Sequence, residues 1–139
     1  MTLRLKGYAE ASSLVFLLSL ALSACASTAS EATVPGVSGH TIRLGILTAL
    51  SGPVADPAGK PYTRGIETFF DAISAQGGID GYQVQLIVED TLYDPQREVV
   101  EYNQIHNQVL MIAGSLGTEP SVAISHLALF DHTLVSVGT

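Results

Sequence analysis

Two short segments of this sequence combine glycine with hydroxyl side chains, residue types that suit the binding of a small anion. They are Ala49-Leu-Ser-Gly-Pro53 and Gly114-Ser-Leu-Gly-Thr118. The second segment leads into a predicted helix, whose free N–H groups and dipole favour an anion such as a carboxylate. Thr118 either adds a hydroxyl donor for such a ligand or caps its own helix, and the spacing leaves both roles open.

Other residues that could carry chemistry lack the partners that catalysis or metal binding needs. Glu89-Asp90 ends a predicted strand, and we interpret it as an acidic strand end that faces water and orders the turn at Asp94, rather than as a phosphoacceptor or metal site. Gly114-Ser-Leu-Gly117 lacks the third glycine of a dinucleotide fingerprint. No nucleophile has a base beside it, and the histidines share no metal-like spacing, so we expect them on the surface: His40, His106, His126 and His132. We therefore expect no enzyme, no metal and no cofactor.

The single cysteine, Cys25, lies where an exported protein would be cut. It closes Leu22-Ser-Ala-Cys25, directly after the apolar run Leu14–Leu22, which two basic residues precede. This order of basic, apolar and small residues predicts a cleavable signal peptide over residues 1–24. The tetrapeptide resembles the bacterial lipobox, which implies lipidation of Cys25. An ordinary signal peptide with a cysteine near its cut has the same order.

Residues 25–39 are small, polar and poor in packing groups, which predicts a flexible tether between the anchor and a folded domain. An acylated Cys25 would hold the protein at the cell envelope, because two or three acyl chains anchor firmly where one does not. We therefore predict an exported protein, in the periplasm or on the outer face of the cytoplasmic membrane, and a direct partner in the membrane through its lipid.

The charge of the chain excludes some partners. Removal of residues 1–24 takes away Arg4, Lys6 and Glu10, so 6 basic residues become 4, 13 acidic residues become 12, and the net charge moves from −7 to −8. A mature chain with this net negative charge repels nucleic acid and anionic lipid headgroups, so neither is expected as a direct partner. One cysteine also excludes an internal disulfide framework.

From residue 40 onward the pattern alternates between strands and helices. Predicted strands cover 42–48, 82–88, 109–113 and 133–137. Predicted helices cover 62–76, begin at Asp94-Pro95, and begin near Pro120. The βαβαβαβ order with short connections predicts an α/β fold, a doubly wound parallel sheet covered on both faces. If the strand order is 2-1-3-4, the two glycine-hydroxyl segments flank the point where the winding reverses, which is where such sheets bind ligands.

Four motifs resemble the leucine/isoleucine/valine-binding family, which comprises type I periplasmic binding proteins of ABC transporters. They are Gly45-Ile-Leu-Thr-Ala-Leu-Ser-Gly-Pro53, Gly77-Gly-Ile-Asp-Gly81, Val88-Glu-Asp-Thr-Leu-Tyr-Asp-Pro95 and Gly114-Ser-Leu-Gly-Thr118. The resemblance covers roughly residues 41–139. It implies that residues 40–139 form part of an N-terminal lobe, which in the family closes on its ligand together with a second lobe.

The resemblance also implies site residues and a function. Ser51 and Gly52 match the first-strand loop that lines the cleft. Ser115 lies in the loop that holds the ligand carboxylate, and Thr118 matches that loop's hydroxyl. The implied role is a solute-binding lipoprotein that passes amino acids or related carboxylates to ABC permease subunits. Residues 56–59 depart from the family's usual aromatic-bearing loop, so the family's side-chain selectivity does not carry over.

Two other readings stay open on sequence grounds. A sensor domain of the same fold would bind a similar ligand without transport, and a truncated remnant would keep the export signal without function. The lipobox favours transport over sensing, because a sensor would need a transmembrane segment or a fused signalling domain.

Overall fold

The computed structural model describes residues 33–138. The predicted signal peptide 1–24, Cys25 and the first part of the tether lie outside this range. The described elements follow one another as β1 (Val37–Ser38), β2 (Thr41–Thr48), the π-helical turn η1 (Ala55–Gly59), α2 (Lys60–Ala75), β3 (Gln83–Asp90), α3 (Pro95–Ile105), β4 (Met111–Leu116), α4 (Thr118–Phe130) and β5 (Val135–Gly138). Apart from β1 and η1, this is the predicted alternation.

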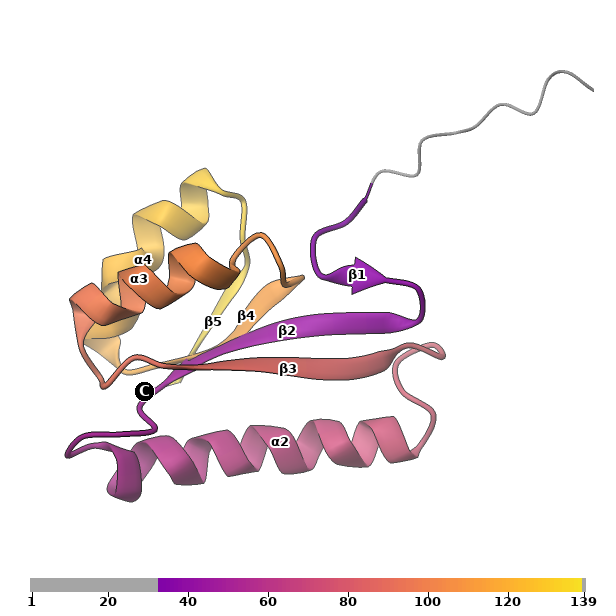
Figure 1. The fold of residues 1–139 in the computed structure, drawn as a ribbon, viewed down its shortest axis with the longest axis horizontal. Helices are drawn as coiled ribbons and strands as arrows, with labels where there is room; N and C mark the ends of the chain where they lie inside the picture. The colour runs from indigo at the N-terminus through magenta and orange to yellow at the C-terminus, as the bar shows by residue number, and fades with distance from the viewer. Residues whose placement is uncertain (1–32, 139) are drawn as a thin grey trace, which may run out of the picture. The chain divides into compact units, whose positions relative to one another are not determined.

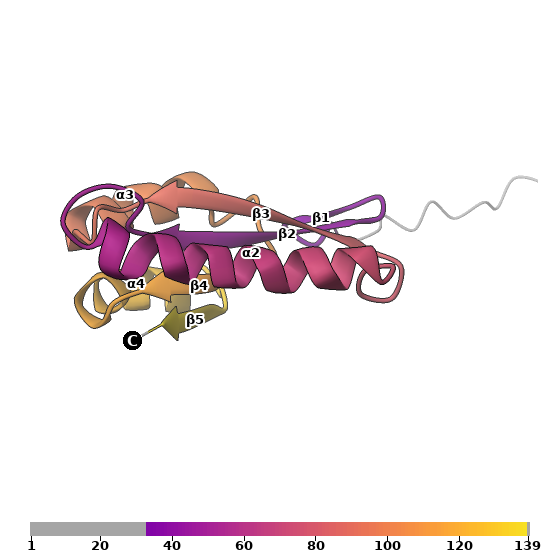
Figure 2. The same cartoon turned by 90° about the horizontal axis from the view of Figure 1, so that it is seen from below.

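Four strands form the parallel sheet that the sequence predicts. β2 pairs with β3 along its whole length and with β4 over its second half, and β4 pairs with β5. The resulting order, β3-β2-β4-β5, is the 2-1-3-4 order under which the two glycine-hydroxyl segments flank the reversal, and it can be followed across Figure 2. The winding therefore reverses between β2 and β4. The predicted doubly wound α/β fold is confirmed.

Helices cover both faces of the sheet. Figure 1 shows α2 on one face and α3 with α4 on the other. The apolar core lies under α3 and α4 and is built from Leu47, Tyr102, Ile105, Val109, Ile112, Ile124 and Ala128. Full burial of a large apolar side chain of this kind is worth about 1.5–3 kcal/mol, so this cluster is the main source of stability for the unit.

On the opposite face, two glycines make room for the ring of Tyr62. A Cβ atom at Gly114 would lie 2.7 Å from the Tyr62 hydroxyl, and one at Gly138 would lie 2.6 Å from its Cε2. Both distances are too short for carbon, so α2 sits this close to β4 and β5 only because these positions have no side chain.

β4 contains a bulge at Ala113. Gly45 pairs with Ile112 and Ile46 pairs with Gly114, which leaves Ala113 without a partner on β2. In a regular strand, residues three apart point to opposite faces. Because of the bulge, Ser115 shares the face of Ile112 and is buried toward α3 and α4.

The helix starts agree with the sequence at α3 and differ at α2. Asp94 caps α3, since its carboxylate accepts a hydrogen bond from the Arg97 amide at 2.8 Å and Pro95 is the first helical residue, as predicted. α2 begins at Lys60, two residues earlier than predicted, because the turn η1 continues directly into it.

The end of the predicted tether is structured. Val37 and Ser38 pair antiparallel with Ile42 and Thr41, and the Arg43 amide donates to the Gly36 carbonyl at 2.7 Å. Residues before the predicted boundary at residue 40 thus pair with the sheet. Small residues around Gly36 and Gly39 predict a flexible segment, but both glycines have positive φ: Gly36 lies in the turn before β1, and Gly39 lies in the turn between β1 and β2.

Candidate functional site

A pocket of about 380 Å³ opens at the edge of the sheet where the parallel strands end. Its walls come from the connections after β2, β3 and β4 and from the end of β5. The lining residues are Val54, Ala58, Tyr93, Leu116, Gly117, Thr118 and Gly138. Most of this surface is apolar, and Thr118 adds a hydroxyl. The pocket thus lies at the position where doubly wound sheets bind ligands.

Thr118 contributes to this pocket as the first residue of α4. The N-cap is Gly117, with φ of 100°, and no side chain caps the helix. The alternative role of Thr118, as a cap for its own helix, is therefore wrong. Pro120 has no N–H, so the leading amides of α4 come from Thr118 and Glu119, next to the exposed Thr118 hydroxyl.

Asp90 shapes the loop that contains Ser51. Its carboxylate accepts hydrogen bonds from the amides of Leu50 (2.8 Å), Ser51 (3.3 Å) and Leu92 (3.1 Å) and from the Ser51 hydroxyl (2.5 Å). Partial burial pushes the pKa of Asp90 upward, but the four hydrogen bonds outweigh it and hold the pKa below the usual range.

This finding extends the sequence interpretation of Glu89-Asp90. Asp90 helps to order the turn before α3 through the Leu92 amide, and that turn is also closed by a hydrogen bond from the Asp94 amide to the Thr91 carbonyl. Asp90 in addition orders the Ser51 loop, which the sequence did not predict. The sequence shows an acidic residue at a strand end. It does not show that the partner loop lies forty residues earlier in the chain.

The loop after β3 holds Leu92 and Tyr93 in left-handed backbone conformations, with φ of 55° and 61°. Two consecutive non-glycine residues in this region are uncommon and cost of order 1–3 kcal/mol each. The ring of Tyr93 fills the space beside Gly117, where any Cβ would collide with it. The strained loop thus places an aromatic ring in the pocket wall.

Ser115 lies beneath the pocket and does not line it. Its side chain is fully buried, and its hydroxyl lies 2.6 Å from Glu98 Oε1 and 2.6 Å from the Ser121 hydroxyl. Ser121 Oγ is in turn 2.6 Å from the Gly117 carbonyl oxygen. This buried polar group connects α3 to the start of α4.

The four predicted site residues therefore occupy three environments. Thr118 faces the pocket. Ser51 and Gly52 are exposed at the same edge of the sheet, where Ser51 is bound to Asp90, and Ser115 is buried below. Tyr93, Val54 and Ala58 also line the pocket and were not predicted from the sequence. For Tyr93 the sequence did offer one signal, because it is an aromatic residue between a predicted strand end and the Asp94-Pro95 helix start.

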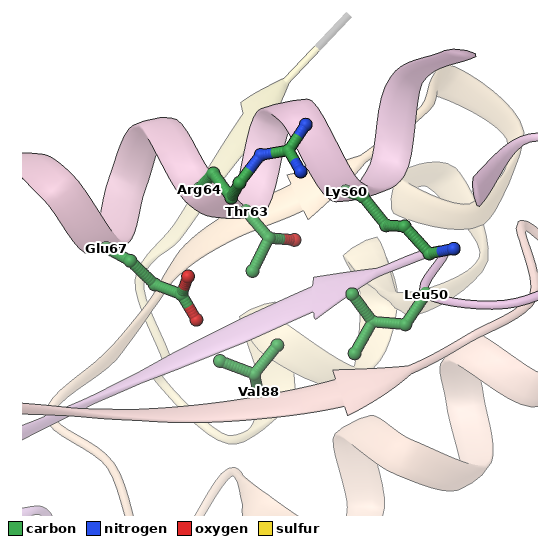
Figure 3. A pocket seen from close by; sticks show the side chains of 6 residues that line it. All are labelled: Leu50, Lys60, Thr63, Arg64, Glu67 and Val88. Carbon is green, nitrogen blue, oxygen red and sulfur yellow. The ribbon is translucent and has the colours of Figure 1, made fainter. Parts of the chain in front are cut away.

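A second hollow of about 260 Å³ lies between α2 and the strands β2 and β3. Figure 3 shows Lys60 and Glu67 at its two ends and Thr63 between them, above Leu50 and Val88. Lys60 is already paired with Asp56 at 2.6 Å. Charged side chains from successive turns of one helix, over an open apolar floor, form an ordinary solvated helix flank, so this hollow is the weaker candidate.

Within residues 33–138, no group of three or more His, Cys, Asp or Glu side chains is arranged to hold a metal ion. No helix in that range has the length and apolar character to cross a bilayer. The expected surface position holds for three histidines. His106 is half-buried and stacks on Tyr102 at a ring distance of 5.2 Å.

Known proteins resemble this chain in sequence and in fold. The Leu/Ile/Val-binding protein of Escherichia coli K12 is 35% identical over 66 residues, which are 48% of this chain and 18% of that protein. A fatty acid ABC transporter substrate-binding protein from Thermomonospora curvata superimposes with a TM-score of 0.72 at 33% identity, over 76% of this chain and 27% of that one. A type 1 periplasmic binding protein from Bordetella pertussis Tohama I gives a TM-score of 0.64 at 26% identity, over 68% and 26%.

The chain thus spans 18% of its curated relative's length and 27% of the Thermomonospora protein's. The profile of the family described as "Periplasmic binding protein" matches residues 41–138, which include β2 to β5, the three helices and every residue of the pocket. The chain belongs to the periplasmic binding protein family.

Proposed function

We propose that this protein is an exported, lipid-anchored substrate-binding protein that binds a small organic carboxylate and delivers it to an ABC importer. The observation that supports this most is the pocket at the strand ends, where Thr118 and the leading amides of α4 meet an apolar wall. Amino acids are the first ligand class, because the Escherichia coli relative is named for leucine, isoleucine and valine.

In this proposal the ligand carboxylate binds to the Thr118 hydroxyl and the first amides of α4. The helix dipole and the free N–H groups favour an anion there. Tyr93, Val54 and Leu116 provide apolar contact for the remainder of the ligand. Ser51 and Gly52 contribute the exposed loop at the same edge, and Ser115 supports the site from below.

Fatty acids are the second ligand class. The Thermomonospora relative is described as a fatty acid transporter component, and it resembles this chain over more residues than the Escherichia coli protein does. A mainly apolar pocket with one hydroxyl also suits an alkyl carboxylate. The two classes differ in the ammonium group, so an amino acid needs an additional acceptor that a fatty acid does not.

Calorimetry on a two-lobe protein tests the site and separates the classes. Residues 33–138 would be joined to the remainder of the Thermomonospora relative and titrated with leucine, isoleucine and octanoate. Thr118→Val should weaken carboxylate binding by roughly tenfold or more, as expected for a lost hydrogen bond to a charged group of about 1.5–3 kcal/mol, with an unchanged melting temperature. Ser125→Ala, at the exposed far side of α4, is the matched control. Unchanged affinity in Thr118→Val would place the site elsewhere.

The isolated chain should bind neither class usefully. A carboxylate at a helix start contributes about 0.3–1 kcal/mol when exposed and up to about 2 when partly buried. Immobilising a free ligand costs several kcal/mol. In the proposed two-lobe protein the described pocket is one side of the binding site, so titration of the 139-residue chain with millimolar leucine should give no saturable heat. Micromolar binding would mean that the pocket is complete by itself.

The anchor is proposed from Cys25 and the residues before it. In a bacterial host, Cys25→Ser should accumulate as an uncut precursor that takes up no labelled fatty acid. Normal cleavage and membrane retention of this variant would contradict lipidation while leaving the binding proposal intact.

A further inference from the structure

A buried chain of four oxygen atoms runs from α3 to the start of α4, and its hydrogen atoms can be counted. The chain is Glu98 Oε1, Ser115 Oγ, Ser121 Oγ and the Gly117 carbonyl oxygen, and each neighbouring pair is 2.6 Å apart. At this distance a hydrogen must lie between the two oxygens, since 2.6 Å is in the range of an O–H···O bond. Three contacts therefore need three hydrogens.

The two serines supply only two of them. If Glu98 is ionised, Ser115 donates to it, and Ser121 can then reach either Ser115 or Gly117 but not both. One pair of oxygens would face each other at 2.6 Å with no hydrogen between them. The Gly117 carbonyl has no hydrogen to give. The only remaining source of the third hydrogen is the carboxyl group of Glu98.

We propose that Glu98 is a neutral carboxylic acid in the folded protein, and that it donates through Ser115 and Ser121 to the Gly117 carbonyl to hold the start of α4 in its binding shape. The hydrogen-bonded row of oxygen atoms fixes the position of Gly117. This residue has φ of 100°, and its amide donates to the Gly138 carbonyl at 2.8 Å. Glu98 is therefore a positioning residue for the site, and this part rests on the proposed function.

The surroundings of Glu98 favour the neutral form. Its side chain is fully buried, and Oε2 has no hydrogen-bond partner among the described residues. A buried carboxylate with one oxygen unpaired would be strongly destabilising, whereas a carboxylic acid tolerates it. Burial raises the pKa of Glu98, although hydrogen bonding with Ser115 and with Thr91 works against the rise.

The titratable groups on the surrounding elements give no compensating charge. The basic groups on these elements are Lys60 and Arg64 on α2, Arg97 on α3 and His126 on α4, and the others are acidic or phenolic, among them Tyr62, Glu89, Asp90, Glu101 and Glu119. Lys60 is paired with Asp56 at 2.6 Å, and Arg97, the next residue in sequence, is paired with Glu101 at 2.8 Å. Arg64 and His126 are exposed, whereas the Glu98 side chain is fully buried.

Protonation of Glu98 makes the free energy of unfolding depend on pH in one direction. A carboxyl whose pKa is raised by folding keeps its proton in the native state after the unfolded chain has lost it. Stability is then highest in acid and falls as pH rises through the folded pKa. Between the two pKa values, the unfolding constant should rise tenfold per pH unit relative to a variant without this group.

Glu98→Gln supplies that variant, because its amide can donate to Ser115 without titrating. Unfolding of the full chain by urea would be measured from about pH 4, near the ordinary glutamate pKa, to about pH 9, for wild type, Glu98→Gln and the exposed control Glu119→Gln. Wild type and the control should lose stability relative to Glu98→Gln as pH rises. Parallel curves for all three would overturn the proposal.

Spectroscopy on the wild type needs no substitution. Infrared spectra of chain labelled with ¹³C-glutamate should show a carboxylic-acid carbonyl band at neutral pH, and its absence would overturn the proposal even if Glu98→Gln failed to fold. Hydrogen exchange of the Gly117 and Ser121 amides, which donate to the Gly138 and Gly117 carbonyls, should quicken in Ser121→Ala, and unchanged exchange would contradict the positioning role. If the two-lobe protein binds no carboxylate at all while the band is present, the proposed function fails and the protonation stands.

Discussion

At the residue scale, single polar side chains shape the loops around the pocket. Asp90 gathers three amides and one hydroxyl from two loops. Sequence analysis found Thr118, because a glycine-hydroxyl segment before a helix is a local pattern. It could not assign Asp90 or Ser115, because their partners come from distant segments and from the bulge at Ala113, which reverses the face of Ser115.

Asp90→Ala tests whether the Asp90 carboxylate stabilises these loops. Loss of a charged acceptor should lower the free energy of unfolding at pH 7 by about 1.5–3 kcal/mol. Because the pKa of Asp90 is lowered by folding, its contribution is present above the ordinary aspartate pKa of about 3.9 and disappears as pH falls through the folded value. Urea titrations at pH 7 and in acid should therefore show a gap from wild type that closes in acid. Asp71→Ala, at an exposed position of α2, is the control, and an equal effect there would refute the assignment.

At the element scale, the order of helices and strands was predictable from the apolar periodicity and from the Gly, Pro and capping residues at element ends, because these are local properties of the sequence. The Asp94-Pro95 start of α3 was predicted to the residue. The turn η1 and the hairpin of β1 were not, because each depends on contact with a strand. Gly59, for instance, packs against the Ala49 backbone, which no sequence period records.

The packing of α2 on the sheet gives a prediction for this scale. Gly114→Ala should destabilise the unit by about 1–3 kcal/mol, because the new methyl meets the Tyr62 hydroxyl. In a Tyr62→Phe background the cost should be smaller, and a double-mutant cycle by chemical denaturation measures the difference. Gly65→Ala is the control: nothing lies within 4 Å of the added carbon, so helix propensity should stabilise it by up to about 1 kcal/mol. Additive effects of the Gly114 and Tyr62 changes would contradict the contact.

At the scale of the whole molecule, the fold class was predictable from the alternation of strands and helices, whereas the strand order was only assumed from the few topologies that a doubly wound sheet permits. Among the described residues, large apolar side chains stand exposed on α4, β5 and the turn between them: Val122, Leu129, Phe130, Leu134 and Val137.

This surface predicts self-association. A free strand edge beside exposed apolar side chains is a template for pairing with another chain. Sedimentation of residues 26–139 should show a concentration-dependent rise in mass, and Leu129→Glu with Phe130→Glu should reduce it. A monomer across the concentration range, with a sharp thermal transition, would contradict the prediction.

The short hairpin of β1 fixes where the chain enters the domain. β1 pairs with Thr41 and Ile42, at the start of β2, while the pocket lies beyond Thr48, at the other end of the same strand. A strand rises about 3.3 Å per residue, so some 25 Å separate the two. Figure 1 shows β1 and the C-terminal end at opposite poles of the sheet. A tether that joins the domain at this entry point pulls on the end of the sheet opposite the pocket opening. With the proposed lipid anchor, the domain can therefore be held at a membrane while the pocket opening stays accessible.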